Sequence, residues 1–121
     1  AADQHLAVLR QAGLIKQVRS HIASLLESGD VTLESVSKIM GVSVRQLRHQ
    51  LSSAGTNFQK ILNDLRHRLA VRLLSQTSED ISEIIYLTGF CEPSTFYRAF
   101  KRWEGTTPIH YRNKHQSGND H

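Results

Sequence analysis

The sequence predicts an all-α protein in which a long linker helix joins two helix-turn-helix subdomains. Apolar residues recur at the three- and four-residue spacing of amphipathic helices, and no long stretch alternates with the period of two that strands require. Glycines fall where successive helices would end. One arrangement of helix, glycine turn and helix occurs twice. The expected parts are N-terminal helices with the first helix-turn-helix unit in residues 1–55, the linker helix in 56–76, the second unit in 77–112 and a disordered tail in 113–121.

Composition bounds the class of protein. A hydrophobic content of 39% in 121 residues suffices for a globular core. Fifteen basic against eleven acidic residues give a net charge of +4 and a pI near 9.6, which favours a polyanionic partner. The single cysteine, Cys91, excludes an internal disulfide and suits the cytoplasm, and no apolar run resembles a membrane span or a signal peptide. Because the chain begins Ala-Ala-Asp without a methionine, we expect it to be a fragment of a longer protein.

The first unit is preceded by two predicted helices. Residues 3–11 are expected to form a short helix that Gly13 ends. The next helix, up to Gly29, carries an apolar stripe of Leu14, Ile15, Val18, Ile22, Leu25 and Leu26. We interpret both helices as packing elements with solvated charges.

The first unit is predicted from its caps and its turn. Thr32 is the expected N-cap of a helix that buries Leu33, Val36 and Ile39. Residues 41–43 make the turn, and Ser43 caps a second helix that runs to about Ala54.

The linker is predicted to be one long helix. It starts with a capping box of the Thr-x-x-Gln type, formed by Thr56 and Gln59. Its inward side is expected to present Phe58, Ile61, Leu62, Leu65, Leu69 and Leu73. From residue 57 to residue 75 such a helix spans about 28 Å at about 1.5 Å per residue. This length approaches the roughly 34 Å between successive major grooves on one DNA face.

The second unit repeats the plan of the first. Asp80 is the expected N-cap and Glu83 its capping-box partner, ahead of a helix that Gly89 ends. Pro93 suits the first turn of the following helix, where a missing N–H costs nothing. That helix gathers Phe96, Ala99, Phe100 and Trp103 on one face and Ser94, Arg98, Lys101 and Arg102 on the other, with Tyr97 at the flank.

The second helices of the two units superpose residue by residue. Leu47 pairs with Phe96 and Leu51 with Phe100, 49 residues apart in both cases. The outward positions are then Arg45, Arg48, His49 and Ser52 in the first unit and Ser94, Tyr97, Arg98 and Lys101 in the second. A helix with a buried face and a basic outer face, set after a glycine turn, is typical of a DNA reader. The alternative is a helical protein-interaction module whose basic faces bind an acidic partner.

The second unit also resembles a known signature. The residues that carry it are Gly89-Phe90, Phe96, Arg98, Phe100-Lys101-Arg102, Gly105, Thr107-Pro108 and Tyr111-Arg112. Together they resemble the signature of the AraC/XylS family of bacterial transcription regulators. The resemblance covers roughly residues 14–112. It implies binding to double-stranded promoter DNA with help to RNA polymerase, usually as an activator, in the bacterial cytoplasm at the nucleoid. It also implies a separate N-terminal regulatory domain through which the full protein can dimerise, while this fragment is expected to be monomeric.

The resemblance implies specific DNA contacts. Base contacts are implied for Arg45, Arg48, His49, Pro93, Ser94, Tyr97 and Arg98. Backbone contacts are expected from Thr32, Ser43, Lys101, Arg102 and Thr107, and the basic pair after the buried Phe100 favours phosphates over bases. His49 could read a base, touch a phosphate or do neither, and Tyr97 could stack, donate a hydrogen bond or pack. The sequence departs from the family at Ser37 and Ile85, where Ala is usual, and at Leu51-Ser52, where Phe-Lys is common, so a phosphate contact at Ser52 is not carried over.

Other chemistries find little support in the sequence. Seven histidines and one cysteine do not form a zinc-ligand pattern; His110 and His115 are five residues apart. We find no glycine-rich phosphate loop and no nucleophile–base set, so we expect no enzyme, no metal and no cofactor. Cys91 beside the predicted DNA face is interpreted as a partly exposed structural thiol, with a redox or alkylation switch as the alternative.

Overall fold

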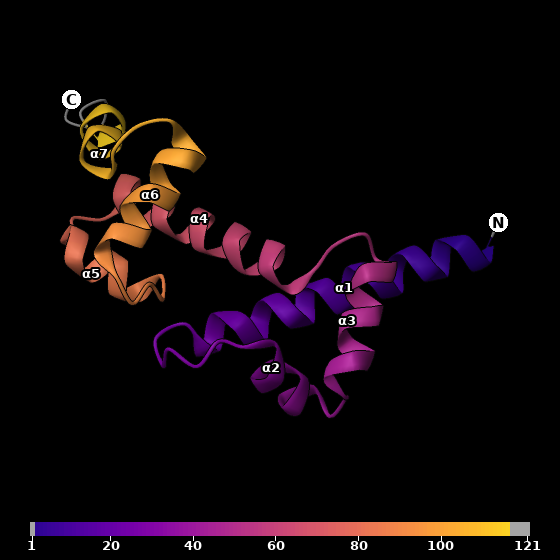
Figure 1. Cartoon of the computed structure of the whole chain (residues 1–121). Coiled ribbons are helices and arrows are strands. Elements are labelled where there is room, and N and C mark those ends of the chain that lie inside the picture. Colours follow the sequence, from indigo (N-terminus) through magenta and orange to yellow (C-terminus); the bar gives the residue numbers. More distant parts are fainter. Residues whose placement is uncertain (1, 117–121) are drawn as a thin grey trace. The chain divides into compact units, whose positions relative to one another are not determined.

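The protein is all-helical throughout the part of the chain that its computed structural model describes, residues 2–116, with side chains described from residue 6 onward. Figure 1 shows the helices of this part, which are α1 (Ala2–Leu25), α2 (Leu33–Met40), α3 (Val44–Ser53), α4 (Phe58–Gln76), α5 (Ile81–Leu87), α6 (Pro93–Glu104) and α7 (Pro108–Gln116). The chain divides after Leu65 into two compact units. The predicted all-α fold with two helix-turn-helix units and a long connecting helix is confirmed.

Helix α1 runs through Gly13 without a break, so the prediction of a short helix ending there is wrong. A glycine inside a helix costs only about 0.5–1 kcal/mol relative to alanine, and packing on either side outweighs this cost. Val18 and Ile22 are fully buried on the C-terminal side of the glycine. On its N-terminal side, Gln11 Nε2 donates a hydrogen bond to the Ser53 carbonyl at 3.2 Å.

Helices α2 and α3 form the first helix-turn-helix and pack on α1. The predicted caps are confirmed: Thr32 Oγ1 accepts from the Ser35 amide at 2.9 Å, and Ser43 Oγ accepts from the Gln46 amide at 3.0 Å. Ser35 Oγ in turn accepts from the Thr32 amide at 3.0 Å, which completes a reciprocal capping box. The buried side chains of the unit are Val18, Ile22, Leu26, Val36, Ser37, Leu47, Leu51, Ile61 and Leu62.

Ile39 was predicted to be buried, but it is 50% exposed. The buried face of α2 is centred between Val36 and Ser37, both of which are at most 3% exposed. At 100° per residue, position 39 is turned about 110° from that centre. The small Ser37 side chain therefore occupies the core position that the prediction gave to Ile39.

Helix α4 contributes to the core of each unit with a different segment. Ile61 and Leu62 are buried in the first unit, and Ala70 and Leu74 are buried in the second. Its N-cap is Asn57, whose Oδ1 accepts from the Lys60 amide at 2.9 Å. The predicted Thr56–Gln59 capping box is wrong, because Gln59 Nε2 donates instead to Asn63 Oδ1 at 3.2 Å. The predicted inward residues Phe58, Leu65, Leu69 and Leu73 are half-buried.

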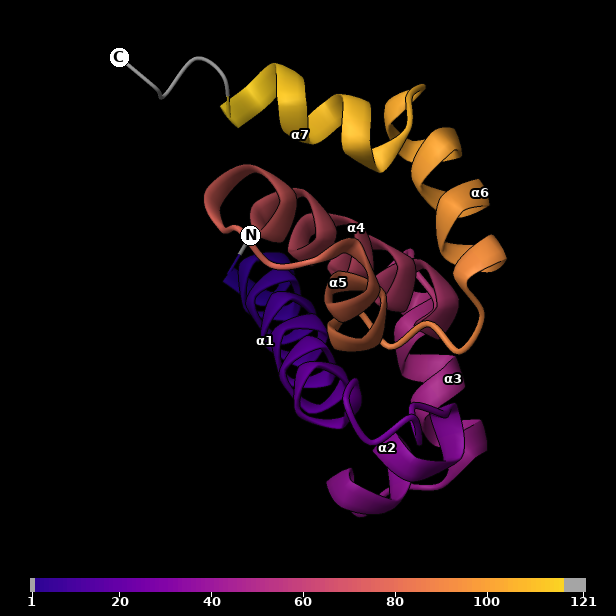
Figure 2. The same ribbon diagram turned by 90° about the vertical axis from the view of Figure 1, so that its left-hand side faces the viewer.

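The second unit gathers α5, α6 and α7 around the C-terminal half of α4, as Figures 1 and 2 show. Its buried cluster consists of Ala70, Leu74, Ile84, Ile85, Phe96 and Phe100, against which Val71, Leu73, Ile81, Phe90, Trp103 and Tyr111 pack. Pro93 lies at the start of α6, as predicted. Asp80 takes the N-cap position of α5, but its side chain makes no capping hydrogen bond, so the predicted capping box with Glu83 is wrong. The Asp80 side chain is exposed, which leaves the first amides of α5 to water.

Residues 113–116 were expected to belong to a disordered tail, but they continue α7 to Gln116. Gln116 Nε2 donates to the carbonyls of Leu74 and Thr77 at 2.7 and 2.6 Å. The His115 ring stacks on Tyr111 with centroids 4.0 Å apart. These contacts stabilise the last turn of α7. The rest of the expected tail, residues 117–121, lies outside the described residues.

Candidate nucleic-acid interface

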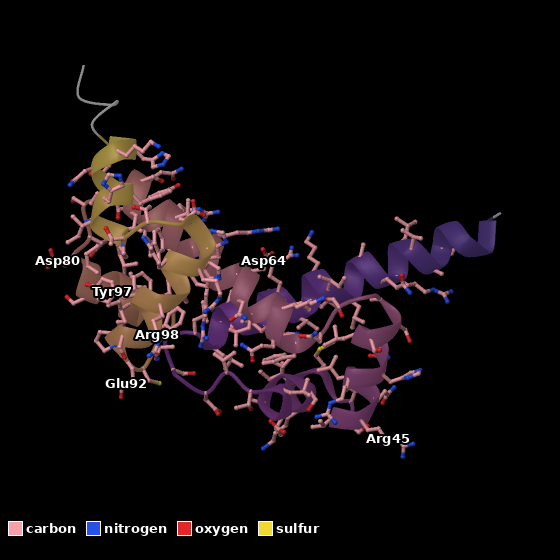
Figure 3. The ribbon with its side chains drawn as sticks, turned by 45° about the horizontal axis from the view of Figure 1, so that its top comes forward. Arg45, Asp64, Asp80, Glu92, Tyr97 and Arg98 are labelled. Carbon is pink, nitrogen blue, oxygen red and sulfur yellow. The ribbon has the colours of Figure 1, made fainter. Side chains whose placement is uncertain are left out.

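Helix α3 presents a polar face to solvent because its apolar residues point into the first unit. Leu47 and Leu51 are 0% and 1% exposed, respectively. The predicted outward residues Arg45, Arg48, His49 and Ser52 are all exposed. Figure 3 shows Arg45 projecting away from α3. The 3.6-residue period therefore predicted both faces correctly.

The outward residues of α3 fall into two groups. Arg45 and His49 line a surface hollow of about 410 Å³ together with the capping residue Ser43. Arg48 and Ser52 line a different groove of about 420 Å³, whose other walls are Leu33, Leu51 and the chain from Thr56 to Gln59. The structure thus brings Arg45 and His49 together on one side of α3 and places Arg48 on another.

Helix α6 carries the corresponding face of the second unit. Phe96, Ala99 and Phe100 are buried at 4% exposure or less. The predicted outward residues Pro93, Ser94, Tyr97, Arg98, Lys101 and Arg102 are all exposed. Tyr97 is 41% exposed, and its ring meets the Phe96 ring edge-on at 5.8 Å. The ring is therefore held by packing on one side while the other side faces solvent.

Three of the expected backbone-contact residues are helix caps. Thr32 and Ser43 cap α2 and α3, and Thr107 Oγ1 accepts from the His110 amide at 3.1 Å at the start of α7. All three are exposed. Helix N-termini carry partial positive charge and favour anions such as phosphate. Lys101 and Arg102 lie instead in the last turn of α6, where the helix dipole favours cations.

Arg66 contacts the turn between α5 and α6, and sequence reasoning missed it. It is half-buried, and its Nε and Nη2 donate to the carbonyls of Thr88 and Gly89, both at 3.1 Å. Its guanidinium carbon lies 4.6 Å from the centre of the Phe90 ring. Burial lowers the pKa of Arg66, and the nearby Cys91 opposes this shift. The sequence signal that could have revealed Arg66 is its place one helical turn before Ala70, on the buried side of α4.

Two further side chains, His67 and Arg112, hold the second unit together through polar contacts. His67 stacks on Trp103 at 4.9 Å and its Nε2–H donates to the Glu104 carboxylate, which joins α4 to the end of α6. Arg112 donates to the carbonyls of Leu73, Leu74 and Thr77 at 3.1–3.3 Å. This places a cation among carbonyls at the C-terminal end of α4, where the helix dipole favours positive charge.

The structure adds little to the other chemistries considered. Cys91 is exposed. Among the described side chains, no three His, Cys, Asp or Glu residues are grouped so that they could hold a metal ion. None of the helices described is long and apolar enough to cross a membrane.

The two units together define a class of protein, namely a helix-turn-helix DNA-binding domain with two exposed second helices. The sequence matches the family described as "Helix-turn-helix domain" over residues 36–114. Among solved structures, the C-terminal domain of AraT, a response regulator from Geobacillus stearothermophilus, is similar, with 30% identity, a TM-score of 0.74 and 84% of each chain covered.

A second solved structure carries the name of the family. A transcriptional regulator from Chromobacterium violaceum, described as an AraC-type DNA-binding domain-containing protein, is 26% identical with a TM-score of 0.74, and the match covers 86% of this chain and 93% of that one. The ornithine utilization regulator of Pseudomonas aeruginosa is 42% identical over 103 residues, which are 84% of this chain and 30% of the regulator. The chain belongs to the AraC/XylS family and is a DNA-binding domain of a transcription regulator, not an enzyme. Membership of this family favours DNA binding over the interpretation as a module that binds an acidic protein partner. The chain spans about a third of the length of the curated relatives it matches.

Proposed function

We propose that the domain reads one asymmetric stretch of promoter DNA with α3 and α6 in two successive major grooves. The observation that carries this proposal is the repeated exposed face, because α3 and α6 present polar residues at equivalent positions 49 residues apart. Residues 1–55 and 77–112 supply the two readers, and residues 56–76, most of them in α4, connect them. Since the two faces differ in sequence, a single copy recognises unlike half-sites, and the fragment binds as a monomer.

Direct readout belongs to the exposed residues of α3 and α6. In α3 these are Arg45, Arg48 and His49, and in α6 they are Pro93, Ser94, Tyr97 and Arg98. Arginine pairs with guanine through two hydrogen bonds, the commonest specific contact in the major groove. Arg45 and Arg98 are both exposed and appear in Figure 3 on the two helices.

Backbone contacts fix the register of each helix in its groove. Lys101 and Arg102 supply cations at the end of α6. Thr32, Ser43 and Thr107 lie at helix N-termini, whose polarity attracts phosphate. Contacts of this kind raise affinity for every sequence equally.

The whole regulator acts on transcription in the bacterial cytoplasm at the nucleoid. Its DNA-bound form assists RNA polymerase and activates the promoter. A further domain carries the signal response and the dimer contact. This proposal is supported by the length of the curated relatives, since the chain spans about 30% of the ornithine utilization regulator.

Site selection from random DNA tests the two-groove proposal. The variants are Arg45→Ala, Arg98→Ala and their double mutant, with Arg72→Ala, an exposed arginine of α4, as the control. Each reading variant is expected to lose about 1–3 kcal/mol and to relax base preference at one half-site only. The two half-sites should be centred about 10 base pairs apart, and the two losses should add.

Two results would contradict the proposal. One is that Arg45→Ala and Arg98→Ala relax the same base positions. The other is that the wild-type domain protects only about one groove in a footprint. If no variant changes any profile and binding follows salt alone, the acidic-partner interpretation regains support.

A further inference from the structure

Two consecutive carbonyls of the α5–α6 turn are bound by one side chain of the second unit. The Arg66 guanidinium takes the Thr88 and Gly89 carbonyls through two bonds of 3.1 Å. Thr88 is fully buried, and its hydroxyl donates to Ile84 and Ile85 carbonyls at 2.8 and 3.0 Å. Gly89 has a φ of 81°, so the chain reverses at this point into α6. The turn that leads into the reading helix is therefore tied directly to α4.

Arg66 holds more than one atom of this turn. Besides the two carbonyls, the guanidinium covers the face of Phe90, 4.6 Å from the ring centre. The Phe90 ring in turn meets Phe96, at the base of α6, edge-on at 5.5 Å. A single side chain of α4 thus sets the position of the turn through the backbone and, through Phe90, touches the buried side of the reading helix.

The first unit lacks this arrangement. The two units align 48 residues apart before the turn. Gly41 and Gly89 have φ of 73° and 81°, and the Val42 and Phe90 amides donate equivalent hydrogen bonds at 3.0 and 3.2 Å. The same spacing places Val18 where the second unit has Arg66. Val18 is fully buried, and its aliphatic side chain has no group that could donate to the carbonyls of the first turn.

We propose that Arg66 is a positioning residue for DNA reading by α6, which makes base discrimination by the second unit depend on a residue of the linker helix. The proposal rests on the function proposed above, that α6 reads bases. Arginine suits the role because its planar fork can donate to two carbonyls at once and stack on an aromatic ring, whereas lysine offers one compact charge. Small displacements of a reading helix weaken hydrogen bonds to base edges more than they weaken contacts to phosphates, because the former have the stricter geometry.

The test compares Arg66→Met and Arg66→Lys with the wild type. Methionine keeps much of the buried volume but leaves both carbonyls without their donor, and lysine keeps the charge without the fork. The matched control is Arg72→Met, because Arg72 is an exposed arginine of the same helix. Each variant is titrated against the selected DNA site, against random DNA and against sites with single base changes in either half. The half-sites are assigned beforehand from the Arg45→Ala and Arg98→Ala profiles.

For Arg66→Met we expect about ten-fold weaker binding to the selected site, with the loss confined to discrimination at the α6 half-site. Discrimination at the α3 half-site and affinity for random DNA should stay at wild-type level. For Arg66→Lys we expect a discrimination at the α6 half-site between that of the wild type and that of Arg66→Met. Circular dichroism at the assay temperature verifies that each variant is folded; if Arg66→Met is not, Arg66→Lys decides, with the same half-site pattern expected.

Equal losses at both half-sites, equal losses on random DNA, or no loss at all would overturn the positioning role. A wild-type domain without any base preference would instead contradict the proposed function, so the two failures can be told apart.

Discussion

The two helix-turn-helix units share one backbone plan but stabilise opposite ends of their first helices. In the first unit, Thr32 and Ser35 bond reciprocally at the start of α2, while the buried Val18, which cannot donate a hydrogen bond, takes the position that Arg66 has in the second unit. In the second unit, Asp80 makes no side-chain cap at the start of α5, while Arg66 binds the carbonyls of the turn at its end. The comparison teaches that the same geometry can be held by satisfying amides at one end or carbonyls at the other.

The two cores also differ in chemistry. Leu47 and Leu51 fill the first unit where Phe96 and Phe100 fill the second. The rings of the second unit contact one another, with Phe96 and Phe100 centroids 6.0 Å apart and Phe100 edge-on to Tyr111 at 5.5 Å. Aromatic pairs add about 0.5–1.5 kcal/mol to the burial of their area. We therefore expect the second unit to depend more strongly on single core residues.

The largest expected effect comes from Phe100→Ala, which removes a fully buried ring. Such a change costs about 3–5 kcal/mol, whereas its counterpart Leu51→Ala costs about 2–5 kcal/mol. Hydrogen exchange resolved along the chain checks where the loss falls. We expect faster exchange in residues 66–116 for the first variant and in residues 6–65 for the second. Equal acceleration throughout by either variant would show that the units unfold together.

Removal of the Arg112 side chain is expected to cost less. Arg112→Met takes away three hydrogen bonds to carbonyls near the end of α4. Each carbonyl keeps another donor, Gln116 Nε2 for Leu74 and Thr77 and the Thr77 amide for Leu73. The loss is therefore that of shared hydrogen bonds, about 0.5–1.5 kcal/mol, which urea unfolding measures directly. The exposed Arg72→Met serves as the control and should change stability by less than about 0.5 kcal/mol. Equal effects of the two variants would mean that the Arg112 contacts add nothing.

The caps provide a sharper test of the contrast between the units. Thr32→Ala removes an observed capping bond and should cost about 1 kcal/mol. Asp80→Ala removes a side chain at the equivalent position that makes no capping bond, so only a few tenths of a kcal/mol should be lost through the helix dipole. Thermal unfolding of both variants measures the difference. If Asp80→Ala costs as much as Thr32→Ala, the contrast between the two helix starts is wrong.

The smallest expected effect is a dependence on alkaline pH. Burial, assisted by the nearby Glu104 carboxylate, raises the pKa of Tyr111. The folded pKa of Tyr111 therefore lies above the unfolded value of about 10. The stability that the neutral Tyr111 side chain contributes is fully present below that pH and is lost as pH rises through the folded pKa. Tyr111→Phe should therefore lose stability less steeply than the wild type above about pH 10. Parallel stability curves for the two proteins would contradict this expectation.

Sequence periodicity predicted the features that depend on local order. The buried pairs Leu47–Leu51 and Phe96–Phe100 and the exposed residues opposite them follow from 3.6 residues per turn. The caps Thr32 and Ser43 follow from short side chains that reach their own helix. Where a local rule failed, at Gly13, distant packing outweighed a cost of about 1 kcal/mol.

The positioning contacts could not be predicted in the same way. Arg66 and Arg112 bind backbone carbonyls 22 to 39 residues away, and every residue type carries such a carbonyl. No pattern of side chains marks the partner, so only the folded chain reveals the pair. The base and phosphate contacts remain predictions, since exposure on α3 and α6 is a requirement for them and not a measurement of them.

The distribution of rings between the units has a consequence for optical spectroscopy. Of the four Phe, three Tyr and one Trp residues, only Phe58 lies before Arg66. Trp103, the sole tryptophan, stacks on His67 within the second unit. Intrinsic fluorescence and near-ultraviolet dichroism therefore report on the second unit, and the first is nearly silent. Far-ultraviolet dichroism detects the helices of both, so a gap between the two signals during denaturation would measure, without any label, how far the first reader can unfold while the second stays intact.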